Sequence, residues 1–272
     1  MNLPAAILLG IVQGLTEFLP VSSSAHLILA RTFFGWEVPP ELGLAFDVAL
    51  HVGTLAAILL FFHKDVVAMI ASTPAVLSPE PGDAGRLVRN IVAGTIPVVI
   101  VGVLFNDVIE DVLRTPQVAA IALAVGATLM LMAERAGSRT RDERGITWVD
   151  AVLIGCAQAS ALIPGMSRSG TTIAIAMFLG FRRENAAKFT FLLAIPAMLA
   201  AAAKETLELR HMTVGADAVQ LFAVGMIVSA VVGYVTIKYF LRFLAGHRLD
   251  VFAYYRYALA ACALGFFVAR GT

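Results

Sequence analysis

Long apolar stretches recur along this chain of 272 residues, and shorter polar segments separate them. A helix needs about twenty residues to cross the hydrocarbon core of a bilayer. Six stretches reach that length, and they lie near 44–63, 87–106, 117–134, 185–204, 216–243 and 251–269. The pattern therefore predicts an all-α polytopic membrane protein with six transmembrane helices.

Two further apolar regions, about 3–34 and 147–181, have a different pattern. Each is a pair of short apolar stretches, and a proline with a Ser- or Gly-rich turn separates the two. Neither side of the break is long enough for a full crossing. Irregular backbone is tolerated at membrane depth only where it is buried in protein or lines a polar cavity. We therefore expect two re-entrant helical hairpins with polar residues at their tips.

Three predicted spans separate the two hairpins, so the hairpins must enter the membrane from opposite faces. Each half, 1–134 and 147–272, then consists of one hairpin followed by three spans. This arrangement is an inverted-topology repeat within a single membrane domain, 1–272, and such repeats place a shared site near the midplane. The longest connection, about 64–86, contains three prolines and is expected to be a surface loop.

Lysine and arginine residues indicate the orientation, because the cytoplasmic connections of membrane proteins are enriched in them. One set of connections holds thirteen: Lys64, Arg86, Arg89, Arg135, Arg139, Arg141, Arg144, Arg182, Arg183, Lys188, Lys238, Arg242 and Arg248. The other set holds five: Arg31, Arg114, Lys204, Arg210 and Arg270. This bias predicts that both termini lie outside the cytoplasm. The first hairpin would then enter from the outer face and the second from the cytoplasmic face.

The overall composition agrees with a membrane location. Hydrophobic residues make up 59% of the chain and charged residues 14%, and the mean hydropathy is +0.85. A soluble domain of this length needs far fewer apolar residues, so the chain is expected to be an integral membrane protein. The net charge is only +1. Such a balance does not provide the basic surface that binds nucleic acid, so the expected partner is the bilayer.

The tip of the first predicted hairpin concentrates polar side chains, namely Gln13, Glu17, Ser22, Ser23, Ser24 and His26. Gln13 and Glu17 are four residues apart, so both project from one face of a helix. A buried carboxylate needs a cation or a proton, which makes Glu17 a candidate metal ligand or acid–base group; the alternative is an acid that only pairs helices. His26 lies three residues after Ser23, and this spacing would let it act as the base for that hydroxyl.

The second tip repeats the order of glutamine, proline and Ser-x-Ser in Gln158, Pro164, Ser167 and Ser169, and it adds Arg168 and Thr172. Hydroxyl and backbone N–H groups at a helix start, together with a guanidinium, favour a phosphate oxygen. Arg168 is also the natural partner of Glu17 across the pseudo-two-fold axis. A purely structural ion pair is the alternative, but such a pair would not need the surrounding hydroxyl groups.

Together the two blocks closely resemble the motifs of the undecaprenyl-diphosphate phosphatases of the bacitracin-resistance family, and the resemblance covers nearly the whole chain. It implies a bacterial inner-membrane enzyme that removes the terminal phosphate of undecaprenyl diphosphate, a polyprenyl diphosphate lipid, and returns the monophosphate carrier to cell-wall synthesis. It also implies a divalent cation, Mg²⁺ or Ca²⁺, and a homodimer. This chain departs from the family pattern in two places. Gln13 stands where many members have a second Glu, and Ser24-Ala25 replaces the more usual Thr-Gly.

Carried over by position, the resemblance implies catalytic roles for Glu17, Ser23, His26 and Arg168, metal binding by Glu17, and substrate binding by Gln13, Ser22, Ser167, Ser169 and Thr172. The leading hypothesis is hydrolysis of a phosphoanhydride at a site open to the outer face, with Ser23 or a water as nucleophile and His26 as base. A transporter or flippase of a polyprenyl phosphate is the alternative, because inverted repeats with broken helices also build transporters. A third and weaker alternative is a scaffold whose polar tips only assemble helices.

Overall fold

The structure is a computed structural model that describes residues 2–36, 40–78, 80–209 and 215–270. Within these ranges the chain folds into eleven α-helices and has no β-sheet. The helices are α1 Leu3–Thr16, α2 Ser23–Phe34, α3 Pro40–Phe61, α4 His63–Ser72, α5 Gly82–Leu104, α6 Pro116–Ala136, α7 Trp148–Ser160, α8 Arg168–Phe178, α9 Arg183–Leu209, α10 Ala216–Gly246 and α11 Asp250–Arg270. Short helical turns lie at η1 Thr73–Ala75, η2 Val108–Leu113 and η3 Glu143–Gly145.

The six helices expected to cross the membrane are present. Among the described residues, α3, α5, α6, α9, α10 and α11 are long and apolar enough for a span. Helix α5 begins at Gly82, earlier than the apolar pattern alone predicts. The reason is that Gly82 has a positive φ of 67° and follows Pro81, so the chain turns sharply there and the helix starts directly after it. The prediction of an all-α protein with six transmembrane helices is confirmed.

The connection expected to be a surface loop is only partly irregular, because it contains helix α4. The prolines that indicated a loop follow this helix instead of interrupting it, and the first of them, Pro74, lies in η1. No residue of α4 is buried, which agrees with a surface position. Asp65 in its first turn pairs with Lys188 of α9 at 3.0 Å. The expectation of a loop over 64–72 is therefore wrong, but the expected surface position of this segment is confirmed.

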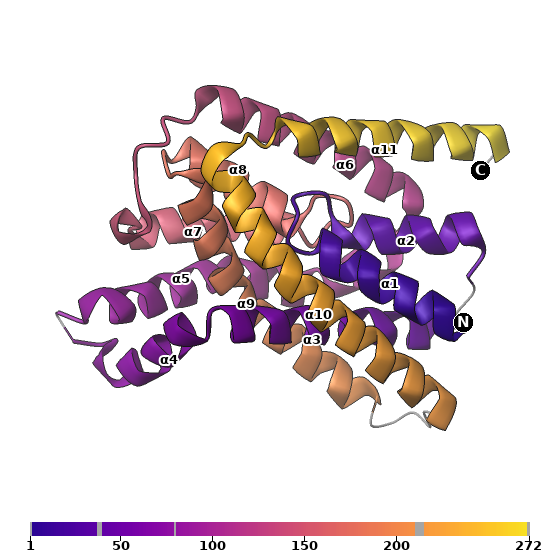
Figure 1. The fold of residues 1–272 in the computed structure, drawn as a ribbon, viewed down its shortest axis with the longest axis horizontal. Helices are drawn as coiled ribbons and strands as arrows, with labels where there is room; N and C mark the ends of the chain where they lie inside the picture. Colours follow the sequence, from indigo (N-terminus) through magenta and orange to yellow (C-terminus); the bar gives the residue numbers. More distant parts are fainter. Residues whose placement is uncertain (1, 37–39, 79, 210–214, 271–272) are drawn as a thin grey trace.

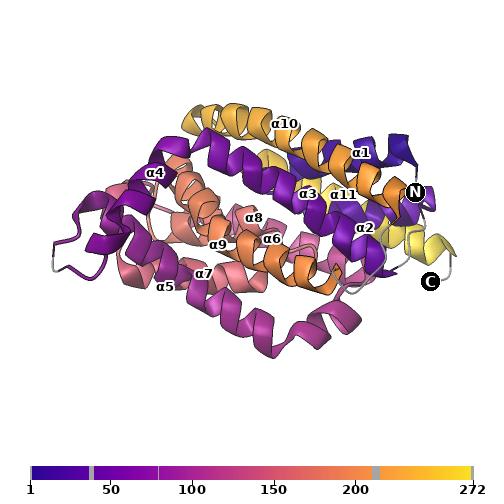
Figure 2. The same cartoon turned by 90° about the horizontal axis from the view of Figure 1, so that it is seen from below.

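Two helical hairpins meet near the centre of the molecule. Helices α1 and α2 form one pair and α7 and α8 the other, and Figure 1 shows their connecting turns approaching each other from opposite ends. Figure 2 shows α10, α3, α9 and α5 following one another across the molecule. Helix α1 packs on α10 at one side and α7 packs on α5 at the other. The hairpins predicted from the sequence are present; their re-entrant course in a bilayer stays a prediction.

The two hairpins pack against their supporting helices in the same way. A Cβ atom at Gly10 of α1 would lie 2.8 Å from the carbonyl oxygen of Gly225 in α10. A Cβ atom at Gly155 of α7 would lie 2.1 Å from the carbonyl oxygen of Gly94 in α5. Small residues at these crossings let the backbones approach closely, as is common between membrane helices. Matching crossings of this kind agree with two related halves, although the inverted-topology repeat itself stays a prediction.

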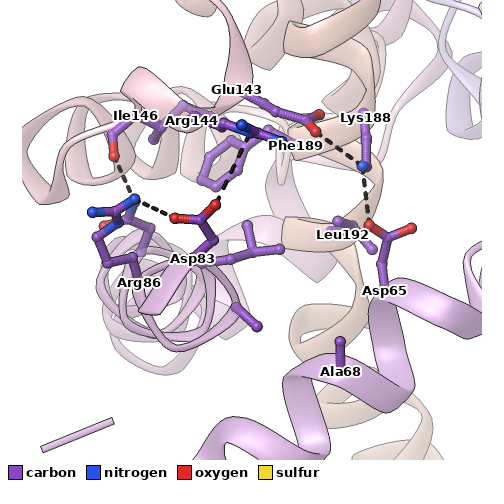
Figure 3. Close-up of a pocket in the computed structure, with 13 residues that line it drawn as sticks. Asp65, Ala68, Asp83, Arg86, Glu143, Arg144, Ile146, Lys188, Phe189 and Leu192 are labelled. Atoms are coloured by element: carbon purple, nitrogen blue, oxygen red, sulfur yellow. Dashed lines mark hydrogen bonds and ion pairs between the residues drawn. The ribbon is translucent and has the colours of Figure 1, made fainter. Parts of the chain in front are cut away.

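A cavity of about 260 Å³ lies away from the tips, between α4, α5, η3 and α9 (Figure 3). Its charged side chains pair with one another, because Lys188 contacts Glu143 at 3.1 Å and Asp65 at 3.0 Å. Asp83 contacts Arg86 in the same cavity (Figure 3). Acids and bases are thus balanced there. The cavity therefore lacks the unbalanced charge that a phosphate site needs.

The glycine at the crossing of α7 and α5 generates a stability prediction. Gly155→Ala should lower the free energy of unfolding by about 1–3 kcal/mol, because the added methyl group meets the backbone of Gly94 and forces the helices apart. Thermal unfolding of the purified protein in detergent measures the effect. Gly246→Ala at the end of α10 is the control, since a Cβ atom there meets no heavy atom within 4 Å. An equal melting temperature for both variants would contradict the close contact between Gly155 and Gly94.

Candidate active site

The turn of the first hairpin ends at a strained serine. After α1 ends at Thr16, the chain turns through Pro20, and Ser22 has a positive φ of 74°. The hydroxyl of Ser22 caps α2, because it accepts a hydrogen bond from the backbone N–H of Ala25 at 3.4 Å. It also lies 3.2 Å from the hydroxyl of Ser24. A positive φ is unusual for a residue with a side chain and is often associated with a functional site.

The turn of the second hairpin has the same local geometry. Ser167 has φ of 68°, caps α8 by accepting from the backbone N–H of Gly170 at 3.2 Å, and lies 3.3 Å from the hydroxyl of Ser169. Gly165 precedes it with φ of 100°, and a Cβ atom there would lie only 2.3 Å from the carbonyl oxygen of Ala119. Glycine is required at this position both by the backbone angle and by the lack of space. The paired Ser-x-Ser motifs thus form equivalent helix starts.

The two tips are in direct contact, as the sequence predicted. Arg168 of the second tip forms an ion pair with Glu17 of the first. The hydroxyl of Ser169 donates to the carbonyl oxygen of Leu19 at 3.0 Å. The hydroxyl of Ser24 accepts from the backbone N–H of Gly165 at 3.4 Å. Residues far apart in the chain therefore form one polar site between the hairpins.

Glu17 is the centre of this site, and its carboxylate is almost completely buried. Arg168 contacts one carboxylate oxygen, Oε1. The other oxygen, Oε2, accepts from Ser23 Oγ at 2.7 Å and from Gln13 Nε2 at 2.9 Å. His51 Nε2 of α3 lies 3.4 Å from the same oxygen. Four polar groups from four helices, α1, α2, α3 and α8, therefore surround a single carboxylate.

His51 was not among the residues predicted for the site. The sequence contained only a weak signal, the spacing of Asp47 and His51 by four residues in the first span. In the structure His51 Nδ1 lies 2.7 Å from the carbonyl oxygen of Asp47, which leaves Nε2 directed at Glu17. Only the packing of α3 on the first hairpin brings this histidine to the carboxylate.

His26 does not make the contact that its spacing suggested. Its Nδ1 lies 2.7 Å from the backbone oxygen of Ser22, and its Nε2 lies 2.7 Å from the hydroxyl of Tyr255 in α11. The two rings are nearly parallel, with an interplanar angle of 6°. The hydroxyl of Ser23 donates to Glu17 instead. The expected Ser23–His26 contact is wrong because His26 lies one helical turn after Ser22 and its ring folds back onto that carbonyl group.

The start of each returning helix offers unpaired donors. Within the described part of the chain, no acceptor is found for the backbone N–H groups of Ser23, Ser24, Arg168 and Ser169. Helices α2 and α8 both begin at the tips, so the positive ends of their helix dipoles lie close together there. Free N–H groups at a helix start form a ready-made anion site. The tips therefore combine two such starts with the guanidinium of Arg168.

The remaining predicted residues are buried and support the second tip. Ser167 is the cap of α8, and Thr172 Oγ1 donates to the carbonyl oxygen of Arg168 at 2.6 Å. A cavity of only about 10 Å³ lies beside Glu17 and Arg168, and the hydroxyl of Thr190, which has no partner in the described structure, lines it. A space of that size holds about one water molecule. A phosphate group can therefore enter only if the Glu17–Arg168 pair opens.

The residues present offer a divalent cation few ligands. Among the described residues, no three His, Cys, Asp or Glu side chains lie close enough to hold a metal ion together. Glu17 supplies one carboxylate, and Gln13 Oε1 is buried without a partner. Mg²⁺ in enzymes of phosphate chemistry often has one or two protein ligands and takes the rest from substrate and water. Gln13 and Glu17 fit a cation that arrives with a phosphorylated substrate.

Comparison with known proteins identifies the family of this chain. The family model of the bacitracin resistance protein BacA matches residues 6–262. The chain is 44% identical to an undecaprenyl-diphosphatase of Rubrobacter xylanophilus over 266 residues, which cover 96% of this chain and 97% of that protein. It is 43% identical over 269 residues to one of Geotalea daltonii, with 98% of each chain covered. An undecaprenyl-diphosphatase 2 of Stutzerimonas stutzeri is 44% identical over 273 residues, with 98% of this chain and 99% of that protein covered.

A match to the family model over nearly the whole length, together with full-length relatives above 40% identity, leaves one conclusion. The chain belongs to the bacitracin resistance protein BacA family.

Proposed function

We propose that this membrane protein hydrolyses undecaprenyl diphosphate to undecaprenyl phosphate and inorganic phosphate. The observation that carries the proposal is the contact of Glu17, Ser23 and Arg168 between two helix starts. Relatives that match nearly the whole chain are named undecaprenyl-diphosphatases. The product is a lipid carrier for cell-wall synthesis, so the activity would recycle it and would account for the bacitracin resistance in the family name.

Substrate binding would begin with an exchange of partners at Arg168. The terminal phosphate would replace Glu17 on the guanidinium, which can form two parallel hydrogen bonds to a phosphate group. The backbone N–H groups at the starts of α2 and α8 would bind its other oxygens, with support from Ser22, Ser167, Ser169 and Thr172. The exchange also releases Glu17 from its cationic partner. One carboxylate oxygen could then contact a cation while Oε2 remains the acceptor for the proton of Ser23.

The contacts favour Glu17 over His26 as the base for Ser23. Ser23 Oγ would attack the terminal phosphorus while the bond from that phosphorus to the bridging oxygen breaks. Undecaprenyl phosphate would leave, and the hydroxyl proton would pass to Glu17 along the 2.7 Å hydrogen bond. Water would then hydrolyse the phosphoserine to give phosphate and restore Ser23. Direct attack by a water is the alternative, and His26 beside Tyr255 would orient the turn in either route.

A divalent cation, Mg²⁺ or Ca²⁺, would be held by Glu17 and the free Gln13 Oε1 together with substrate oxygens. When bound, it would neutralise charge on the diphosphate. The catalytic side chains would still supply the nucleophile, the base and the guanidinium. Gln13 can contribute only its amide oxygen, because the amide does not titrate.

The location we propose is the bacterial inner membrane, with both termini and the active site toward the periplasm. The charge bias of the connections supports this orientation. The hairpins would then be re-entrant, the first from the periplasmic face and the second from the cytoplasmic face. A homodimer stays a prediction that the oligomeric state in a bilayer would test.

Replacement of Arg168 tests the phosphate-binding role. Arg168→Ala should lower phosphate release from a polyprenyl diphosphate by about 100-fold or more, because phosphoryl transfer depends on charge stabilisation and positioning. Arg168→Lys should retain only part of the rate, since an ammonium cannot form the paired contact. The matched control is Arg242→Ala, at an exposed position of α10. A near-wild-type rate for Arg168→Ala would end this assignment.

The three adjacent serines test the nucleophile. Ser23→Ala should lose far more turnover than Ser22→Ala or Ser24→Ala, while substrate binding is largely retained through Arg168. Ser22→Ala should mainly lower stability, by about 1 kcal/mol, because it removes the cap of α2. Phosphate release and mass spectrometry of a trapped phosphoserine measure these effects. If Ser23→Ala stays active while His26→Ala does not, the covalent route is wrong.

Thiol labelling of intact cells tests the orientation. In a Cys156→Ser, Cys262→Ser background, a cysteine introduced by Asp111→Cys should react with an impermeant reagent. One introduced by Thr140→Cys should react only after the cells are opened. Both positions are exposed in the structure, so burial does not explain a difference. The reverse labelling pattern would place the first hairpin's entrance in the cytoplasm.

A further inference from the structure

Arg256 is a fully buried arginine in the second turn of α11, one of the six candidate membrane spans. No acidic side chain contacts it within the described part of the chain. A buried cation without a counter-charge is costly and is rarely kept at membrane depth without a purpose. Its five N–H donors must therefore find strong acceptors in the protein itself.

The acceptors come from both hairpin tips and from α6. Nη1 donates to the carbonyl oxygen of Pro20 in the first tip at 3.3 Å. Nη2 donates to the carbonyl oxygens of Gly165 at 2.9 Å and Met166 at 3.0 Å in the second tip. Nε donates to the carbonyl oxygen of Leu123 in α6 at 3.1 Å. One planar group thus joins three segments that are distant in the sequence.

The surrounding backbone is shaped for this guanidinium. A Cβ atom at Gly126 of α6 would lie 2.0 Å from Nη2 of Arg256. A Cβ atom at Gly170, in the first turn of α8, would lie 2.8 Å from Nη1. Any side chain at Gly126 would collide with the arginine. Glycines on two different helices therefore leave the space that the group fills.

The carbonyl groups that Arg256 binds in the two tips lie one or two residues before the capping serines. Met166 precedes Ser167, and Pro20 lies two residues before Ser22. Ser167 and Ser22 both have a positive φ, and they are the residues directly before α8 and α2. Fixing these carbonyls fixes the direction in which the free N–H groups of both helix starts point. We propose that Arg256 is a positioning residue that holds the two hairpin tips in register, so that both helix starts can bind one phosphate group.

The functional part of this inference rests on the proposed phosphatase activity, while the structural part does not. A lysine keeps the charge but has three donors on one atom, so it cannot bind both tips and α6 in the same plane. A methionine of similar length keeps the apolar packing and removes the donors. The two variants therefore separate the geometry of the group from its charge.

The distance between the hairpins is the first measurement. Spin labels at Leu15→Cys of α1 and at the native Cys156 of α7 would report it, in a Cys262→Ala background, because both labelled positions are exposed. Pulsed electron double resonance should give one narrow distance distribution for the parent protein and a broader or shifted one for Arg256→Lys and Arg256→Met. Arg242→Met of α10 is the matched control and should leave the distribution unchanged.

Phosphate release is the second measurement. Arg256→Lys should lower kcat/KM at least about tenfold, mainly through kcat, since small displacements of catalytic groups are costly while Arg168 still binds the substrate. If Arg256→Met does not fold, Gly126→Ala tests the same contact, because its methyl group displaces the guanidinium. Unchanged distances in Arg256→Lys and Gly126→Ala would overturn the proposal. A parent protein that releases no phosphate would count against the phosphatase activity alone, since the spin-label distances do not depend on hydrolysis.

Discussion

The ion pair between Glu17 and Arg168 joins two hairpins that approach from opposite ends of the molecule. Burying either charge at membrane depth without the other would cost considerable free energy. Each also lies on a turn whose backbone hydrogen bonds are interrupted, so neither hairpin can complete its polar contacts alone. The pair therefore makes the two halves depend on each other. Under the proposed function, it would also keep the candidate site closed until an anion replaced the carboxylate.

Charge balance explains why an anion would be accepted there. Glu17 is the only acidic side chain among the described groups at the tips, while Arg168 and Arg256 both carry positive charge. Two helix starts add their positive ends to the same region. The site thus has an excess of positive charge that a diphosphate would neutralise. In a water-poor setting such fixed donors are worth more than they are in water.

Buried carboxylates also hold the two ends of the molecule. Glu134 of α6 binds Arg183 of α9 through both of its oxygens, at 2.6 and 2.5 Å. Asp47 of α3 binds Arg31 of α2 at 2.6 Å and also binds Arg114, which precedes α6. These pairs lie outside the tips and add further links between the helices. The proposed exchange of partners at the site would therefore leave these links between the helices intact.

The amino-acid sequence by itself determined that this is a membrane protein, and it also determined the six spans, the two hairpins and the pairing of Glu17 with Arg168. Apolar length and proline position carry this information locally, and the repeated Ser-x-Ser motif indicated which turns are related. Only the tertiary structure decided the partners of Ser23 and His26 and brought His51 and Arg256 to the tips. These contacts join helices that are distant in sequence, and they depend on which face each helix presents in the packed molecule. The spacing of residues within one segment does not predict which helix face packs inward, because the direction of the side chains changes with every residue where a helix is broken.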